Sequence, residues 1–186
     1  WIKIYNDIDG GISIMSELRT NRIIPRDGLP SGSAGGIVQI KYAIKNDTQS
    51  IASQGYSATP TDVSGLSVTI TPTRSDSKIL VQVNIGCHGS SGNAATVFRI
   101  YRGSTNITVS AADTDNRHGA TTFYNNNQTG IGLPVSFSVL DSPATTSATT
   151  YKVTGFANAG TLYVNRLPGD PNWNTISTIT AMEVSG

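Results

Sequence analysis

The sequence predicts an all-β protein, in which an antiparallel β-sandwich or jelly-roll head follows a short β-rich stalk segment. About ten short runs alternate apolar and polar residues, at spacings near 8 to 12 residues and with turn residues between them. Ser, Thr and Asn supply most polar positions, and Glu occurs only at Glu17 and Glu183, so the composition of surface helices is missing. A stretch rich in Pro and Gly, Arg22–Gln39, interrupts the alternation and separates stalk from head.

The stalk and its joint are predicted to span residues 1–36. Two short alternating arms, Ile2–Ile4 and Ile12–Ile14, flank a turn-rich segment. An isolated two-stranded ribbon is marginal in water, so this segment needs neighbours from sister chains or from earlier parts of the same protein. The chain begins at Trp1 within an alternating pattern, and we therefore expect it to be a piece of a longer protein.

The head is predicted to span residues 37–186. Its clearest strand is Ile79–Cys87, whose odd-numbered residues are all apolar and should line the core. A weaker run, Ile51–Thr59, indicates an edge strand, and Asn158–Gly160 between two alternating runs indicates a hairpin. The other expected strands are Ile37–Lys45, Leu66–Thr71, Ala94–Arg102, a short one through Ile107 and Val109, Val135–Val139, Tyr151–Ala157, Leu162–Val164 and Ile176–Val184.

Composition excludes several classes of function. The net charge is only +1 and charged residues make up 13%, which argues against a nucleic-acid surface. No apolar run is long enough to span a membrane, so we expect no membrane insertion. The single Cys87 permits no intrachain disulfide and should be a buried, inert core residue. No phosphate-binding loop, zinc spacing or serine-hydrolase elbow occurs, so we assign no catalytic residue, metal or cofactor.

A set of strand and turn motifs resembles the C-terminal head modules of tailed-bacteriophage fibres, cyanophage fibres among them. The motifs together cover most of residues 21–186, and they are specific as a set. They are Asn21–Pro25, Gly35–Gln39, Gly65–Pro72, Ser77–Val81, Phe98–Gly103, Leu140–Pro143, Thr150–Val153 and Ser177–Glu183. The resemblance implies a homotrimeric fibre tip on the exterior of the virion, with three β-sandwich heads on an intertwined stalk. It also implies that this tip adheres to a host surface and has upstream fibre or virion proteins as partners. Closed cyclic association would also cover the unpaired edges of the stalk.

The densest ionisable cluster is a candidate binding loop. Asp113, Asp115, Arg117 and His118 could hold a sugar through charged hydrogen bonds, or a cation through the two carboxylates. The alternative is a solvated loop with a local ion pair of little consequence. The cluster lacks the Gly and terminal Glu of an EF-hand loop, and Asp-x-Asp alone is too common to indicate a glycosidase.

Two further segments place aromatic rings beside planar amides, the pairing that carbohydrate sites use. Tyr124 and Asn126 belong to the first segment, and Asp170 and Trp173 to the second. Such rings can equally plug the core or lie in a subunit contact. From the organisation into stalk, joint and head and from the resemblance, the leading hypothesis is a virion fibre tip that binds a host-surface glycan or protein. The alternatives are a structural capsid or decoration fibre head without receptor binding and, less favoured, a polysaccharide depolymerase.

Overall fold

The computed structural model describes residues 36–56, 60–90, 94–109, 119–124, 133–167, 170, 172 and 174–184, and for residues 121–124 it describes the backbone alone. The chain divides into two units, Trp1–Gly32 and Ser33–Gly186, and all described residues belong to the second. Apart from Gly36, the predicted stalk segment lies outside the described residues.

Every regular element within the described ranges is a β-strand, as the alternating pattern predicts. The strands are β1 Ile37–Lys45, β2 Gln49–Ala52, β3 Thr61–Ile70, β4 Lys78–Gly89, β5 Ala95–Arg102, β6 Thr105–Asn106, β7 Thr121–Tyr124, β8 Leu133–Asp141, β9 Thr149–Ala157, β10 Thr161–Val164 and β11 Ser177–Val184.

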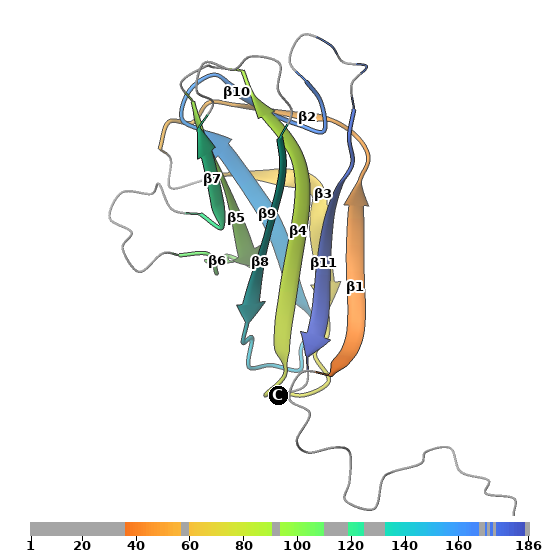
Figure 1. Cartoon of the computed structure of the whole chain (residues 1–186). Coiled ribbons are helices and arrows are strands. Elements are labelled where there is room, and N and C mark those ends of the chain that lie inside the picture. Colours follow the sequence, from red (N-terminus) through yellow and green to blue (C-terminus); the bar gives the residue numbers. More distant parts are fainter. Residues whose placement is uncertain are drawn as a thin grey trace, which may run out of the picture. The chain divides into compact units, whose positions relative to one another are not determined.

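The strands form two antiparallel sheets that face each other (Figure 1). In the first sheet β8 pairs along one edge of β4, while the other edge of β4 pairs with β11 and then with β10. With the short strands β2, β6 and β10 set aside, the orders are β1-β11-β4-β8 and β3-β9-β5-β7. This crossing of successive strands between two sheets is jelly-roll topology. The predicted antiparallel β-sandwich or jelly roll is confirmed.

The core lies between the sheets and is built from every second residue of each strand. Ile79, Val83 and Cys87 of β4 are each no more than 3% exposed, as the alternation predicts. Phe98 of β5 and Phe137 of β8 stack across the two layers with ring centroids 6.4 Å apart. Full burial of one such side chain contributes about 1.5–3 kcal/mol, so this interior is the main source of stability.

A polar cluster also joins the two sheets. Asp141 of β8 accepts hydrogen bonds from Arg102 Nη1 of β5, at 2.8 and 2.9 Å, and from the hydroxyl of Tyr151 of β9, at 2.7 Å. Burial, and then the bond to Asp141, raises the pKa of Tyr151 above its usual range. The phenol therefore stays protonated and keeps donating to the carboxylate.

Four local expectations need correction. No hairpin forms at Asn158–Gly160, because β9 pairs with β3 and β5 in one sheet whereas β10 pairs with β2 and β4 in the other. The edge strand β2 ends at Ala52 and does not extend to Thr59. The short strand expected through Ile107 and Val109 is instead β6, just before them. A further strand, β7, has no counterpart among the expected strands, because its run of two threonines before Phe123 gives little alternation.

We call the end of the sandwich at which β1 begins the proximal end, and the opposite end the distal end. At the proximal end, Ile37 at the start of β1 pairs with Val184 at the end of β11, and the β3–β4 and β8–β9 connections turn there. At the distal end lie the β4–β5 connection and residues 158–160 (Figure 1).

Candidate functional site

Most residues that the sequence singles out as binding candidates lie outside the described residues. These are Asp113, Asp115, Arg117, His118, Asn126 and Trp173. Tyr124 is the last residue of β7, where its backbone pairs with Ala95. Asp170 is half-buried, and its Oδ1 accepts a hydrogen bond from the backbone N–H of Asn172 at 2.9 Å. These sites therefore remain predictions, and the described surface supplies two other features.

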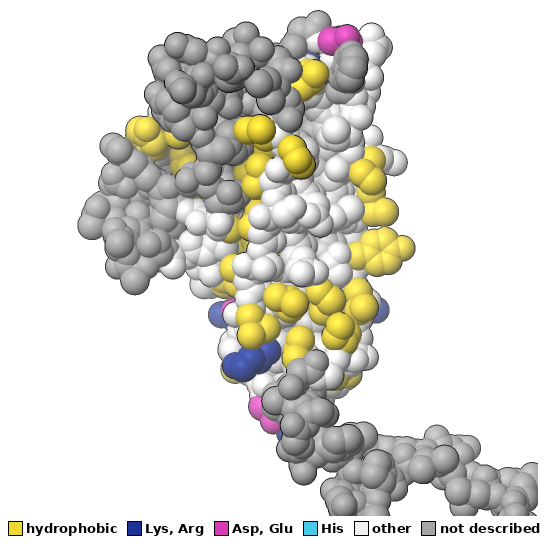
Figure 2. All heavy atoms as spheres, viewed as in Figure 1, with side chains coloured by type: hydrophobic (Ala, Val, Ile, Leu, Met, Phe, Trp, Pro, Cys, Tyr) yellow, Lys and Arg dark blue, Asp and Glu magenta, His cyan; other side chains and the backbone are white. Residues whose placement is uncertain are grey.

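The first feature is an apolar row that crosses the outer face of the β1-β11-β4-β8 sheet. The strand registers place Ile40 opposite Met182, Met182 opposite Leu80, and Leu80 opposite Leu140. All four side chains point away from the core, because their neighbours along each strand point inward. Ile40 is 53% and Leu140 58% exposed. Figure 2 shows hydrophobic side chains gathered over the lower part of this sheet and along β1.

The rest of this face carries very little charge. Outward positions in the two rows beyond the apolar row are Tyr42, Thr180, Gln82 and Ser138, and then Ile44, Thr178, Asn84 and Ser136. Lys78 is the charged outward residue on these four strands, and its Nζ donates to Ser142 Oγ at 2.9 Å. Among the described strands β1 pairs with β11 alone, so the face ends in an edge strand with exposed Ile, Val and Tyr side chains.

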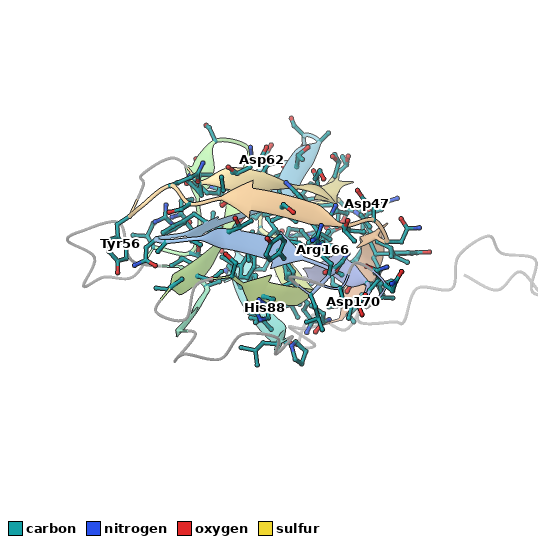
Figure 3. The ribbon with its side chains drawn as sticks, turned by 90° about the horizontal axis from the view of Figure 1, so that it is seen from above. Asp47, Tyr56, Asp62, His88, Arg166 and Asp170 are labelled. Carbon is teal, nitrogen blue, oxygen red and sulfur yellow. The ribbon has the colours of Figure 1, made fainter. Side chains whose placement is uncertain are left out.

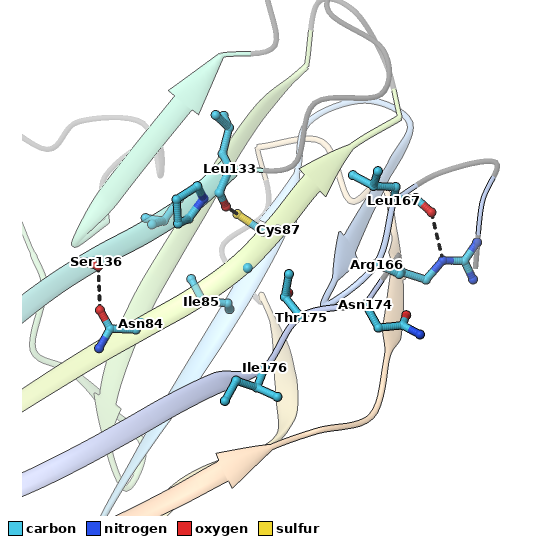
Figure 4. A pocket seen from close by; sticks show the side chains of 13 residues that line it. Asn84, Ile85, Cys87, Leu133, Ser136, Arg166, Leu167, Asn174, Thr175 and Ile176 are labelled. Carbon is cyan, nitrogen blue, oxygen red and sulfur yellow. Dashed lines mark hydrogen bonds between the residues drawn. The ribbon is translucent and has the colours of Figure 1, made fainter. Parts of the chain in front are cut away.

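The second feature is a hollow of about 530 Å³ on the distal half of the same face (Figure 4). It lies between the β4–β8 ladder and the segment that leads from β10 to β11. Pro134, Leu133 and Ile176 supply apolar lining. Asn84, Ser136, Asn174 and Thr175 supply polar lining, and Arg166 lies at its border.

Asn165 holds the segment beside the hollow in place. Its φ is +60°, in the left-handed region that Asn tolerates better than most residues. The buried side-chain amide donates to the carbonyls of Lys45 and Asp47 at 2.9 and 3.0 Å, and its oxygen accepts from the hydroxyl of Ser177 at 2.5 Å. Asn165 therefore fixes the geometry at which the chain leaves β10.

Gly86 permits Thr175 to lie against the sheet at the floor of the hollow. A Cβ at Gly86 would stand 2.1 Å from Thr175 Oγ1, far inside contact distance. The backbone N–H of Asn165 donates to the carbonyl of Gly86 at 2.8 Å, which brings the segment to the same place. Glycine is required at this position by close approach of another chain segment.

The polar groups of the hollow are partly oriented by one another. Ser136 Oγ donates to Asn84 Oδ1 at 2.6 Å across the β4–β8 ladder. Arg166 Nε donates weakly to the carbonyl of Leu167 at 3.4 Å, and its guanidinium carbon lies 4.7 Å from the centroid of the Tyr163 ring. Among the lining residues that the structure describes, there is no carboxylate.

Cys87 and His88, neighbours in the sequence, do not form a catalytic pair. Cys87 faces the core, and burial raises the pKa of its thiol to about 12. His88 occupies the opposite face of β4, and burial lowers the pKa of its imidazole. Figure 3 shows His88 on the side of the sandwich away from Asp62 of β3. The prediction that Cys87 is a buried core residue is confirmed.

The described part of the chain lacks two kinds of feature. No group of three or more His, Cys, Asp or Glu side chains lies close enough to hold a metal ion among the residues that the structure describes. In the same part of the chain, no helix has the length and apolar character needed to cross a bilayer.

Sequence reasoning missed both the row and the hollow. Met182, Leu80 and Leu140 lie at outward positions of strands whose inward positions are mostly apolar as well, so no strand by itself marks an apolar outer face. Only the register of four strands brings them into line. The hollow depends on contacts between residues about 90 positions apart, such as Gly86 and Thr175, and the sequence carries no local signal for them.

Comparison with known proteins gives a limited result. No family model matches the sequence, and no curated protein is similar to it. Among solved structures, PRD1 vertex protein P5 is 14% identical with a TM-score of 0.40, over 81% of this chain and 100% of that chain. A structure of infectious bursal disease virus, Gx strain, is 15% identical with a TM-score of 0.38, over 80% of this chain and 37% of that chain.

A third similar structure, of T=1 particles derived from infectious bursal virus, is 14% identical with a TM-score of 0.37, over 81% of this chain and 37% of that chain. The present chain thus spans little more than a third of the two bursal virus chains. At these identities and TM-scores the similarities do not bear on function.

Proposed function

We propose that this chain is a structural protein of a virion, the head of an exterior tailed-phage fibre that assembles as a homotrimer and attaches to the host surface. The observation that carries the proposal is the apolar row on a nearly uncharged sheet face. Soluble monomers rarely expose a contiguous apolar patch of this kind, and such patches mark contact sites. The jelly-roll head and the resemblance of its sequence motifs to fibre heads support the same reading.

Association of identical chains suits the chemistry of this face. Symmetric packing brings equivalent faces close to one another, and like charges there would repel, whereas Ile, Leu, Thr and Ser do not. Covering the exposed parts of Ile40 and Leu140 would contribute about 1 kcal/mol for each side chain in each copy. It would also cover the β1 edge, which is otherwise open to uncontrolled strand pairing.

The position of the row fits a head on a stalk. Ile40 lies three residues after Ile37, at the proximal end where the predicted stalk joins the head. Chains held together by a stalk at that end would present their rows to each other at high effective concentration. The distal end would then point away from the virion, with its connections free to contact a host.

Adhesion is tested by adding the fluorescently labelled full chain to a panel of aquatic bacteria, cyanobacteria included. The proposal predicts saturable binding to some strains, with loss of binding on Trp173→Ala or Asp115→Ala. Asp76→Ala serves as the control, because Asp76 lies in the β3–β4 turn at the proximal end and pairs with exposed Arg74. A trimer that binds none of the cells would favour the alternative of a structural capsid or decoration head.

We also propose that the protein binds without catalysis. Incubation with bacterial capsule or lipopolysaccharide should release no reducing ends above the level given by heat-denatured protein. Turnover by the native chain would instead identify it as a polysaccharide depolymerase.

A further inference from the structure

We propose that the hollow between the β4–β8 ladder and the described residues 166–167 and 174–176 is a saccharide site that accepts one pyranose ring. This inference rests on the proposed adhesion function and names the class of ligand that the head would recognise. The volume of about 530 Å³ lies within the range of roughly 300–1,000 Å³ that is usual for small-ligand sites.

The strongest evidence is the pairing of Asn84 and Ser136. Because Ser136 donates its hydroxyl hydrogen to Asn84 Oδ1, the Ser136 oxygen is left as an acceptor and the Asn84 amide nitrogen as a donor. The two groups are cross-strand neighbours, so acceptor and donor stand side by side. A sugar hydroxyl, which both donates and accepts, can satisfy both groups at once.

The opposite wall offers a second pair of groups of the same kind. Asn174 and Thr175 line the hollow from the segment that leads into β11. Thr175 donates weakly to Asn165 Oδ1 at 3.4 Å, so its oxygen remains an acceptor, while Asn174 is exposed and carries both a donor and an acceptor. Hydroxyl groups at two edges of one ring can therefore be bound from two walls.

Apolar surface between these walls suits the C–H face of a sugar. Pro134 of β8 lines the hollow, together with Leu133 and Ile176, whose surfaces are 36% and 63% exposed. Because the described part of the lining has no carboxylate, neutral and acidic sugars are both compatible with it. Arg166 at the border would favour an acidic one.

The site can operate in the proposed trimer. The hollow centres on Asn84 and Gly86, four to six residues along β4 from Leu80 of the apolar row. At about 3.3 Å per residue, this separation is about 13–20 Å. Association through the row would therefore leave the hollow open near the distal half of the head.

The test is ligand-observed saturation-transfer NMR on the full chain with D-glucose, N-acetylglucosamine and D-glucuronate as separate probes at about 20 mM, since single sugars bind with dissociation constants in the millimolar range. We expect transfer to at least one sugar, with a fivefold or greater loss on Ser136→Ala and on Asn84→Leu. Ser67→Ala on the other sheet and Asn46→Leu in the β1–β2 corner are the matched controls and should bind like the parent. Thermal melting checks that each variant is folded.

Arg166→Gln separates the two kinds of sugar. It should weaken D-glucuronate and leave D-glucose unchanged if an acidic sugar is the ligand. Absence of transfer to all three probes, or equal transfer in the parent and in folded Ser136→Ala and Asn84→Leu, would overturn the saccharide site. Should these two variants lose sugar binding yet still adhere to cells, the hollow would not be the receptor site, and the adhesion function would stand without it.

Discussion

Glu183, near the end of the last strand, accepts hydrogen bonds at 2.7 Å from both the backbone N–H and the hydroxyl of Thr73, in the turn between β3 and β4. Its other carboxylate oxygen accepts from Gln39 Nε2 of β1 at 2.6 Å. The side chain is fully buried. Burial by itself would raise the pKa of Glu183, but the hydrogen bonds from Gln39 and Thr73 outweigh it and lower the pKa from 4.5 to about 2. One carboxylate thus ties three segments together at the proximal end.

This pKa predicts a loss of stability in acid. The folded pKa lies below the ordinary value, so the stabilisation is complete above about pH 4.5 and disappears as the pH falls through about 2. A shift of this size corresponds to roughly 3 kcal/mol. Chemical denaturation of Glu183→Gln at pH 7 should show a loss of about that size and a flatter dependence on pH between 4.5 and 2. Asp76→Asn, in an exposed pair, is the control, and equal pH profiles of parent and Glu183→Gln would contradict the assignment.

Replacing Asn165 should destabilise the head more than replacing an exposed Asn. Asn165→Ala removes the bonds to Lys45, Asp47 and Ser177 and leaves an alanine with a φ of +60°. We expect a loss of about 2–4 kcal/mol in the free energy of unfolding, measured by urea titration. Asn46→Ala, on an exposed corner, should change it by less than about 0.5 kcal/mol. A small effect at Asn165 would show that its side chain does not hold the segment.

The contact between Gly86 and Thr175 predicts a non-additive pair of mutations. Gly86→Ala should cost about 1–3 kcal/mol, because its methyl group would overlap Thr175 Oγ1. In Thr175→Gly the obstruction is gone, so adding Gly86→Ala to that variant should cost much less. Unfolding free energies of the four proteins in this double-mutant cycle measure the coupling. Additive effects would show that the segment does not lie against Gly86 in solution.

Cys87 should be inert in the folded protein. With a thiol pKa of about 12, almost none of it is thiolate at pH 8, and its side chain is 3% exposed. Iodoacetamide at pH 8 should label the native chain very slowly and the denatured chain fully, as mass spectrometry would show. Rapid labelling of native protein, with unfolding excluded by circular dichroism, would count against the buried placement.

Much of the fold could be predicted from sequence, because strands with one buried face impose a period of two. Ile79–Cys87 shows this most directly, since every inward residue of β4 is apolar. Strand pairing could not be predicted in the same way. Residues 158–160 have the composition of a hairpin turn, yet they carry the chain from one sheet to the other, because the partners of β9 and β10 are chosen by contacts distant in sequence.

The candidate site was less predictable for the same reason. Segments rich in Asp, Asn and aromatic residues predict binding at Asp113, Asp115 and Trp173, which lie outside the described residues. The apolar row and the hollow arise only when β1, β11, β4 and β8 are in register. Glu183 and Thr73, separated by 110 positions, likewise carry no mutual signal in the sequence.

The proposed association through the apolar row should be sensitive to single substitutions. Ile40→Asn and Leu140→Asn should each raise the dissociation constant of the proposed trimer, because an amide in a packed interface would be left without a partner. Both side chains are more than half exposed in the single chain, so the melting temperature of the monomeric head should change little. Ser138→Asn, one row away on β8, is the control and should remain trimeric.

The molar mass of the full chain in solution tests the central claim, assembly of the head as a homotrimer, most directly. Sedimentation equilibrium at micromolar concentration should give three times the chain mass of 19.6 kDa for the parent and for Ser138→Asn. A mass of 19.6 kDa for the parent, unchanged as its concentration rises, would contradict the account.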